Sequence, residues 1–132
     1  VKMTIRVMEW QAFLNTVVHP KKFDAVILGW SLGLMPDAYP LWHSSSDKLG
    51  GFNLVSYKNE KVDKLIEDGI NTINREELGK IYKEIFKIIS DDLPYLFLYI
   101  PDGITVVNKE IKNVEPSFIG IMHNQKDWEL EQ

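Results

Sequence analysis

The spacing of apolar side chains changes twice within the first 30 residues. Apolar and polar residues alternate over 1–7, a period of two that predicts a strand with one buried face. Over 10–18 the apolar residues recur at the spacing of one helical face, and His19-Pro20 closes that run. Residues 23–30 form a nearly continuous apolar run, typical of a strand covered on both faces. This order of elements predicts a right-handed βαβ unit with parallel strands.

The next segment, 31–57, carries Gly, Pro, Ser and aromatic residues without a sustained period. It therefore predicts a long loop with one short helix at 39–43. Loops of this length inside a compact domain are usually functional. The composition thus marks 31–57 as the segment in which to look for a binding site.

Two helices and a hairpin are expected after the loop. Asn59 caps the first helix, and Asn74 with Glu77 has the spacing of a capping box that opens the second. Each cap is followed by an apolar stripe, and Asp91-Asp92-Leu93-Pro94 ends the second helix. The apolar runs on either side of Pro101-Asp102-Gly103 predict a β-hairpin.

Composition narrows the function classes. The chain has 132 residues, of which 45% are apolar, in the range of a globular domain. Its 15 basic and 19 acidic residues give a net charge of -4, and no basic patch could neutralise a run of phosphates, so no nucleic-acid partner is expected. The absence of cysteine excludes disulfides and thiolate chemistry. No apolar run approaches the roughly 20 residues that span a bilayer.

The candidate binding segment lies at the carboxyl end of the second predicted strand, where ligands bind in open parallel sheets. Gly29 permits close approach of a ligand, Trp30 offers a flat ring, and the amides from Ser31 to Gly33 suit a carboxylate or a peptide carbonyl. A core position for Trp30 is the structural alternative. Asp37 is a candidate for holding an ammonium group, and a local cap is its structural alternative.

Metal and cofactor chemistry are not predicted. The three histidines, His19, His43 and His123, are isolated, and none lies four residues from another ligand-type residue on a helix. No glycine-rich phosphate loop occurs, and we expect no cofactor. His43 stands beside Ser44, but a nucleophile needs a third orienting residue in space, so an exposed loop is the simpler interpretation.

Taken in order, several short motifs resemble the extracytoplasmic solute-binding proteins that deliver peptides to ABC importers. The resemblance spans essentially the whole chain. Its residues are Lys22-Phe23-Asp24-Ala25-Val26-Ile27-Leu28-Gly29-Trp30, Pro36-Asp37, Leu41-Trp42-His43-Ser44-Ser45, Gly51-Phe52-Asn53, Tyr57-Lys58-Asn59, Val62-Asp63-Lys64-Leu65, Tyr82-Lys83-Glu84-Ile85 and Asp91-Asp92-Leu93-Pro94-Tyr95-Leu96-Phe97-Leu98-Tyr99.

The resemblance implies an α/β (mixed α+β) fold, the carboxy-terminal portion of a two-lobe binding protein. Residues 1–30 would be the βαβ piece of the second lobe with the hinge crossover, and 31–132 the return segment of the first lobe. It implies a non-catalytic binder located at the periplasmic or extracellular face of the membrane, in some members as a lipoprotein. Such a receptor would take a peptide or another small solute and work with the membrane subunits of an ABC importer.

The resemblance also implies the ligand contacts, namely Gly29, Trp30, Ser31, Gly33, Asp37 and Asn53. Peptide binders of the family commonly have Asp three residues after the Trp, where this chain has Gly33, and Met35 stands where one branch often has an acid. Asp37 would then anchor the ligand's amino group from a longer loop. An aromatic cleft without that anchor would suit an oligosaccharide too.

Intact members of this family are several times longer than 132 residues. We therefore expect a fragment, and pairing of two copies would cover an open sheet. Two other functions remain open. One is a small α/β enzyme using Asp37, His43 and Ser44, and the other is a non-transport interaction module whose helices within 59–91 bind another protein.

Overall fold

The computed structural model describes residues 2–31, 33 and 37–131. The chain divides into two units, Val1–Leu96 and Phe97–Gln132, and each is described by itself. This division into two units does not test the lobe boundary expected after residue 30, which stays a prediction.

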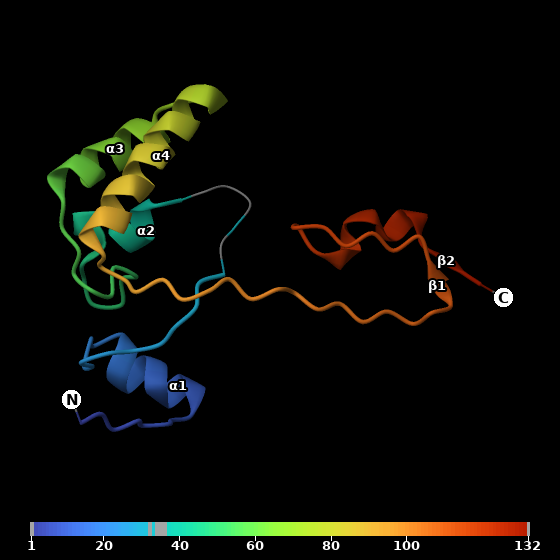
Figure 1. The fold of residues 1–132 in the computed structure, drawn as a ribbon, viewed down its shortest axis with the longest axis horizontal. Helices are drawn as coiled ribbons and strands as arrows, with labels where there is room; N and C mark the ends of the chain where they lie inside the picture. The colour runs from blue at the N-terminus through green and yellow to red at the C-terminus, as the bar shows by residue number, and fades with distance from the viewer. Residues whose placement is uncertain (1, 32, 34–36, 132) are drawn as a thin grey trace. The chain divides into compact units, whose positions relative to one another are not determined.

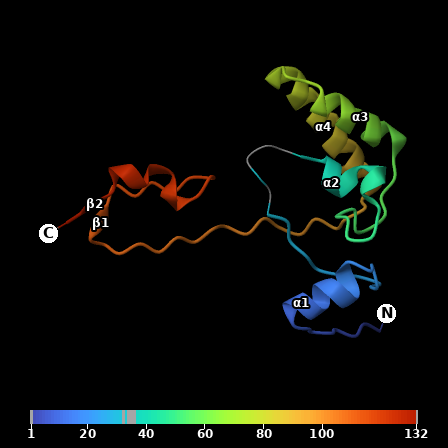
Figure 2. The ribbon, with the colours of Figure 1, turned by 180° about the vertical axis from the view of Figure 1, so that it is seen from behind.

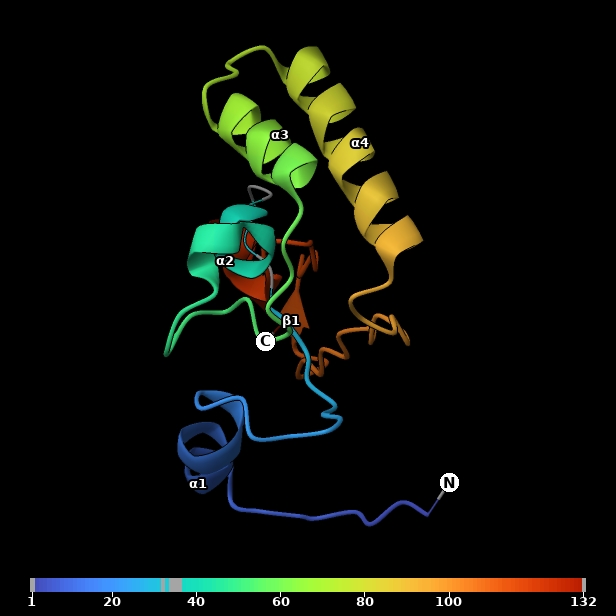
Figure 3. The ribbon, with the colours of Figure 1, turned by 90° about the vertical axis from the view of Figure 1, so that its left-hand side faces the viewer.

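A pair of helices forms the framework of the first unit. Helix α3 spans Glu60–Ile70 and helix α4 spans Arg75–Asp92, and the two lie side by side (Figure 1; Figure 3). The side chain of Asn59 accepts hydrogen bonds from the first turn of α3, and Asn74 does the same for α4. Both predicted caps are therefore confirmed, and they satisfy backbone N–H groups that a helix start leaves open.

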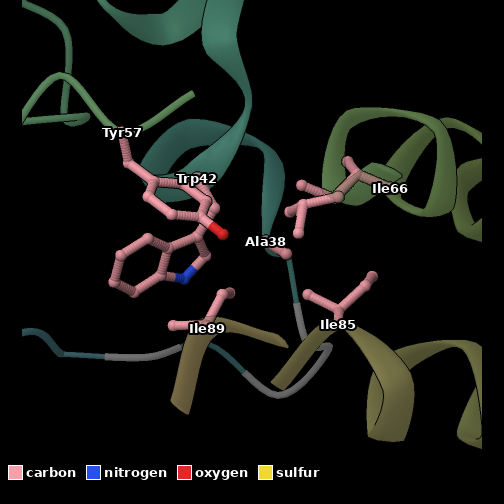
Figure 4. Packing of buried hydrophobic residues seen from close by; sticks show 7 residues of the cluster. Ala38, Trp42, Tyr57, Ile66, Ile85 and Ile89 are labelled. Atoms are coloured by element: carbon pink, nitrogen blue, oxygen red, sulfur yellow. The ribbon is translucent and has the colours of Figure 1, made fainter. Parts of the chain in front are cut away.

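The core lies between these helices and the short helix α2, Tyr39–Trp42. Figure 4 shows the ring of Tyr57 over Trp42, with isoleucines of α3 and α4 facing Ala38. Trp42 meets Tyr57 edge-on at a centroid distance of 5.8 Å. The buried cluster consists of Ala38, Trp42, Tyr57, Val62, Ile66, Ile85 and Ile89.

The predicted apolar stripes of both helices thus supply this core. Fully burying one isoleucine stabilises a fold by about 1.5–3 kcal/mol, so the stripe of α4 is a main source of stability. The apolar residues at the end of α3 and just after it are not part of this core. Ile70 closes the helix with most of its side chain exposed, and Ile73 lies beyond the helix in solvent.

The helix predicted at 10–18 is present as α1, Trp10–Phe13, which continues as a π-helical segment, Leu14–Val18. Glu9 caps it by accepting hydrogen bonds from the amides of Gln11 and Ala12 at 3.0 and 2.9 Å. Its position on the chain is as expected. The cap residue is not one that the sequence pattern had indicated.

The predicted strands of the βαβ unit are not found. Residues 2–7 and 23–30 run without helix or strand (Figure 2), and the second run bends at Asp24. No backbone hydrogen bond joins either run to a described part of the chain. A strand is stable only when a neighbour satisfies its backbone groups, and here the described chain offers none. Val1, the first residue of the predicted strand, lies outside the described residues. The run 23–30 is also not covered on both faces, since Ile27 is largely exposed.

The second unit differs from the predicted hairpin. Residues 98–107 are extended without pairing across Pro101-Asp102-Gly103 in the described chain. The strands that do pair are β1, Ile111–Lys112, and β2, Glu129–Leu130, in antiparallel register. A 3-10 helical segment, Ile121–Asp127, lies between them in sequence.

Asn124 organises this second unit from a buried position. Its Nδ2 donates to the carbonyl oxygen of Asn113 at 2.8 Å, and its Oδ1 accepts from the indole of Trp128 at 3.0 Å. A single amide side chain therefore links the segment after β1 to the segment before β2. Apolar side chains contribute less to this unit, because Phe118 and Ile119 are exposed.

Candidate functional site

Trp30, the central residue of the predicted site, lies at the surface of the first unit. Its side chain is 38% exposed, and its ring meets Phe52 edge-on at a centroid distance of 5.6 Å. Burial raises the pKa of the nearby Tyr95 hydroxyl, and a hydrogen bond with Trp30 acts in the opposite direction. Two aromatic neighbours therefore position the indole while part of it stays accessible, the arrangement of a side chain that can contact a ligand.

The backbone on either side of Trp30 is open. A Cβ added at Gly29 would meet nothing within 4 Å, and Ser31 and Gly33 are exposed. Neither of these last two residues donates a backbone hydrogen bond to a described residue. Leu32, between them, lies outside the described residues. The amides of Ser31 and Gly33 are thus accessible, and their contact with a ligand stays a prediction.

Asp37 acts as a local cap. Its Oδ1 accepts a hydrogen bond of 3.0 Å from the amide of Tyr39 at the start of α2. Burial raises the pKa of Tyr82, and the charge of Asp37 adds to that effect. These residues line an open hollow of about 500 Å³, whose lining does not include Trp30. The structural alternative for Asp37 is therefore present, and its role as an ammonium anchor stays a prediction. Met35 and Pro36 lie outside the described residues.

Asn53 is fully buried and holds the loop together. Its Nδ2 donates to the carbonyl oxygens of Tyr57 and His43 at 2.8 and 3.3 Å. Its Oδ1 accepts from the amide of Tyr57 at 2.8 Å. The side chain therefore bridges two parts of the loop, which favours a structural role over the ligand contact that the resemblance implies. Its neighbour Phe52 is half exposed and contacts Trp30, although it was not among the predicted ligand contacts.

The residues of the enzymatic alternative do not form one constellation. His43 is buried, its ring stacks on Tyr39 at 4.2 Å, and its Nδ1 accepts from the amide of Ser45 at 3.1 Å. Because that amide can only donate, the proton of a neutral ring lies on Nε2, which is 3.4 Å from an oxygen of Glu67. Ser44 instead donates its amide to Asp63 at 2.9 Å. His43 thus fits a structural histidine.

A polar cluster that sequence reasoning missed joins the helix at 10–18 to the loop. The ammonium of Lys21 binds the carboxylate of Asp47, the carbonyl oxygen of Asn53 at 2.7 Å and the hydroxyl of Ser56 at 3.1 Å. The hydrogen bond from Lys21, followed by that from Ser56, lowers the pKa of Asp47 to about 2. Lys58 adds an ion pair at 3.2 Å. The sequence signal was only a lone pair of lysines after His19-Pro20.

The described residues show neither a metal site nor a membrane-spanning helix. Among the residues that the structure describes, no three His, Asp or Glu side chains gather as a metal site. Within the same residues, no helix has the length and apolar character needed to cross a membrane.

The sequence is similar to those of known solute-binding proteins. The chain is 33% identical over 131 residues to the oligopeptide-binding protein AppA of Bacillus subtilis, covering 98% of this chain and 24% of that protein. It is 30% identical over 92 residues to the probable D,D-dipeptide-binding periplasmic protein DdpA of Escherichia coli, covering 68% and 18%. No model of a known protein family matches.

The fold agrees with the sequence match. The structure of AppA in complex with a nonapeptide superposes on 96% of this chain and 25% of that chain, with a TM-score of 0.79 and 34% identity. The chain therefore spans about a quarter of the length of these relatives, and its mixed fold is that of a partial solute-binding protein. By sequence and by fold, the chain belongs to the family of oligopeptide- and dipeptide-binding solute-binding proteins.

Proposed function

We propose that this chain forms part of a receptor that binds a peptide outside the cytoplasm and delivers it to the membrane subunits of an ABC importer. The observation that carries the proposal is the match of nearly the whole chain to an oligopeptide-binding protein whose structure contains a nonapeptide. The relatives are named as binding proteins, which supports a binder and not an enzyme. Their names favour a peptide over an oligosaccharide as the solute.

The peptide would lie along the backbone that follows Gly29. An extended peptide can pair its own amides and carbonyls with an open main-chain segment, as an added strand does. The exposed amides of Ser31 and Gly33 support this placement. Trp30 would flank a ligand side chain, and Asp37, at the start of α2, is the candidate acid for the ligand's amino terminus.

In the whole protein, residues 1–30 would belong to one lobe with the hinge crossover and 31–132 to the other. Closure of two such lobes would bury the peptide. The cluster around Lys21 would then tie the crossover piece to the loop of the other lobe. The periplasmic name of one relative supports an extracytoplasmic location.

The test is a chimera in which this chain replaces the matching quarter of AppA, assayed for nonapeptide binding by calorimetry. We expect the chimera to bind. Trp30→Ala should weaken binding about ten-fold, the equivalent of about 1.4 kcal/mol, because the ring that flanks the ligand is lost. Trp10→Ala is the matched control, since Trp10 is another exposed tryptophan whose ring contacts Phe13.

The outcome is decisive if the chimera keeps a folded far-UV spectrum. A folded chimera that binds no peptide would refute the proposed function for this chain. Binding that survives Trp30→Ala unchanged, or that falls equally with Trp10→Ala, would refute the assigned site while leaving the function standing.

A further inference from the structure

Four lysines line an open hollow of about 510 Å³ beside helices α3 and α4. None of the predicted ligand contacts lines it. Two acidic residues do, so positive charge predominates in the hollow, although the whole chain has a net charge of -4. Lys61 belongs to α3, and Lys80, Lys83 and Lys87 follow one another along α4.

The three lysines of α4 lie on the polar face of that helix. They are exposed, whereas Ile85 and Ile89 on the opposite face are buried in the core. The amphipathic spacing of the helix therefore directs these lysines to solvent. Their exposure does not depend on the apolar side chains that the described chain leaves uncovered elsewhere.

The spacing of the three lysines is unfavourable for the helix by itself. Lys83 lies three residues after Lys80 and four before Lys87. Side chains at these spacings are neighbours on a helix, and like charges there destabilise it. In the described chain none of the three forms an ion pair, whereas Lys61 binds Glu84 at 2.6 Å. An external anion would relieve this repulsion.

The chemistry of the row favours a surface of anionic headgroups over a single anion or an acidic protein. From residue 80 to residue 87 the row spans about 10 Å of helix axis, which presents several separate charges to a surface. All four cations are lysines, which lack the bidentate geometry by which arginine fixes one phosphate or carboxylate. Lysine is depleted in protein–protein interfaces, whereas lysine clusters are attracted to anionic lipids.

We propose that the lysine face of α4, formed by Lys80, Lys83 and Lys87 with Lys61 beside it, docks on the phosphate headgroups of an anionic membrane surface. The negative charge on the rest of the chain would be repelled, so the attraction of this one face would orient the receptor on the bilayer. The inference rests on the proposed function in that the latter places the chain beside a membrane.

The test measures binding of the full 132-residue chain to lipid vesicles by co-sedimentation. One set of vesicles contains equal parts of phosphatidylcholine and phosphatidylglycerol, and the other contains phosphatidylcholine alone. At low ionic strength we expect binding to the anionic vesicles to be at least about ten-fold stronger than to the neutral ones. It should be lost in about 1 M salt, where the Debye length is only about 3 Å.

A matched pair of triple variants identifies the face. Replacing Lys80, Lys83 and Lys87 together by glutamine should weaken binding about a hundred-fold, since each lysine near an anionic surface contributes roughly five-fold. Glutamine keeps the helix propensity of lysine, so the circular dichroism should not change. The control should weaken binding less than about ten-fold, because its charges lie outside the lysine face. It replaces three other exposed lysines by glutamine, namely Lys48, Lys109 and Lys126.

Stronger binding to anionic vesicles that depends on the lysine face would support the proposal. No binding, or equal binding to neutral vesicles, would overturn it, and so would equal losses in the two triple variants, because net charge alone would then explain them. Binding of inorganic pyrophosphate or polyglutamate through the same lysines without vesicle binding would also overturn it, in favour of a soluble anion or an acidic protein.

The outcomes for this inference and for the proposed function are separable. A chimera that binds the nonapeptide, made from a chain that ignores anionic vesicles, would refute the docking face and leave the proposed function standing. Vesicle binding through the lysine face by a chain whose folded chimera binds no peptide would refute only the proposed function.

Discussion

Replacing Asn53 by alanine should destabilise the first unit more than any single polar substitution in its loop. Asn53 is fully buried, and its side chain makes three hydrogen bonds, two with Tyr57 and one with His43. Truncation removes the side-chain partner of the Tyr57 amide and carbonyl, whereas the carbonyl oxygen of His43 still accepts from the amide of Ser46 at 2.9 Å. At about 1 kcal/mol net for each bond, the expected loss is about 3 kcal/mol. This corresponds to a fall in Tm of roughly 12–24 °C for a domain of this size.

The assay is equilibrium unfolding of the full chain in urea, followed by circular dichroism of the helices. Asn71→Ala is the matched control, since Asn71 is exposed and its Nδ2 donates to the carbonyl oxygen of Glu67 at 2.8 Å. We expect that control to cost less than about 0.5 kcal/mol, as for most surface substitutions. Both variants lose an amide that bonds to backbone, but Asn53 is buried and loses three hydrogen bonds, whereas Asn71 is exposed and loses one.

A loss below about 1 kcal/mol for Asn53→Ala would refute the reasoning. It would mean that the loop relaxes, so that water or other groups satisfy the partners of the amide. The same result would favour a ligand-binding role for Asn53, because its side chain would then contribute little to the stability of the fold.

Three further predictions concern this loop and helix α4. Gly51→Ala would bring a Cβ to 2.2 Å from the carbonyl oxygen of Ser46, so we expect the free energy of unfolding in urea to fall by about 1–3 kcal/mol. Gly79→Ala has open space around the new Cβ and should stabilise α4 by roughly 0.5–1 kcal/mol in the same assay. The hydrogen bond from Lys21 lowers the pKa of Asp47 from 3.8 to about 2. The ionised carboxylate of Asp47 therefore stabilises the fold above pH 3.8, and this stabilisation is lost as the pH falls through 2. Asp47→Asn should therefore lower stability at pH 7 and flatten the pH dependence between pH 4 and 2; an unchanged acid profile would contradict this.

The helices of the first unit were predictable because their determinants are local. Asn59 and Asn74 cap the helices that directly follow them, and the stripes that include Ile66 and Ile85 face each other across a short connection. Caps and periodic stripes depend on residues a few positions apart, so a single sequence contains the information.

The polar interior of the loop could not be predicted in the same way. Asn53 bonds to His43, ten residues away, and Lys21 bonds to Asp47 across 26 residues. Such pairs depend on how the chain folds back on itself, and no local pattern encodes their meeting. The motif Gly51-Phe52-Asn53 was identified by resemblance, but its three residues have different roles. Gly51 allows a close approach to the backbone of Ser46, Phe52 exposes its ring, and Asn53 is buried and bonds to the backbone of the loop.

The strand segments show what a hydrophobic pattern does and does not contain. Alternation over 1–7 predicts a strand with one buried face, but Met3, Ile5 and Val7 are exposed, and the pattern says nothing of which segment would supply the neighbouring strand. A helix pairs its backbone N–H and C=O groups within itself, whereas a strand pairs them with a neighbouring strand that can lie at any distance along the sequence. For 2–7 and 98–107 the described chain contains no such partner, so the pattern is intact while the sheet is absent. The strand predictions for these segments are therefore not confirmed in the described residues, because a hydrophobic pattern alone does not supply the neighbour that a strand needs.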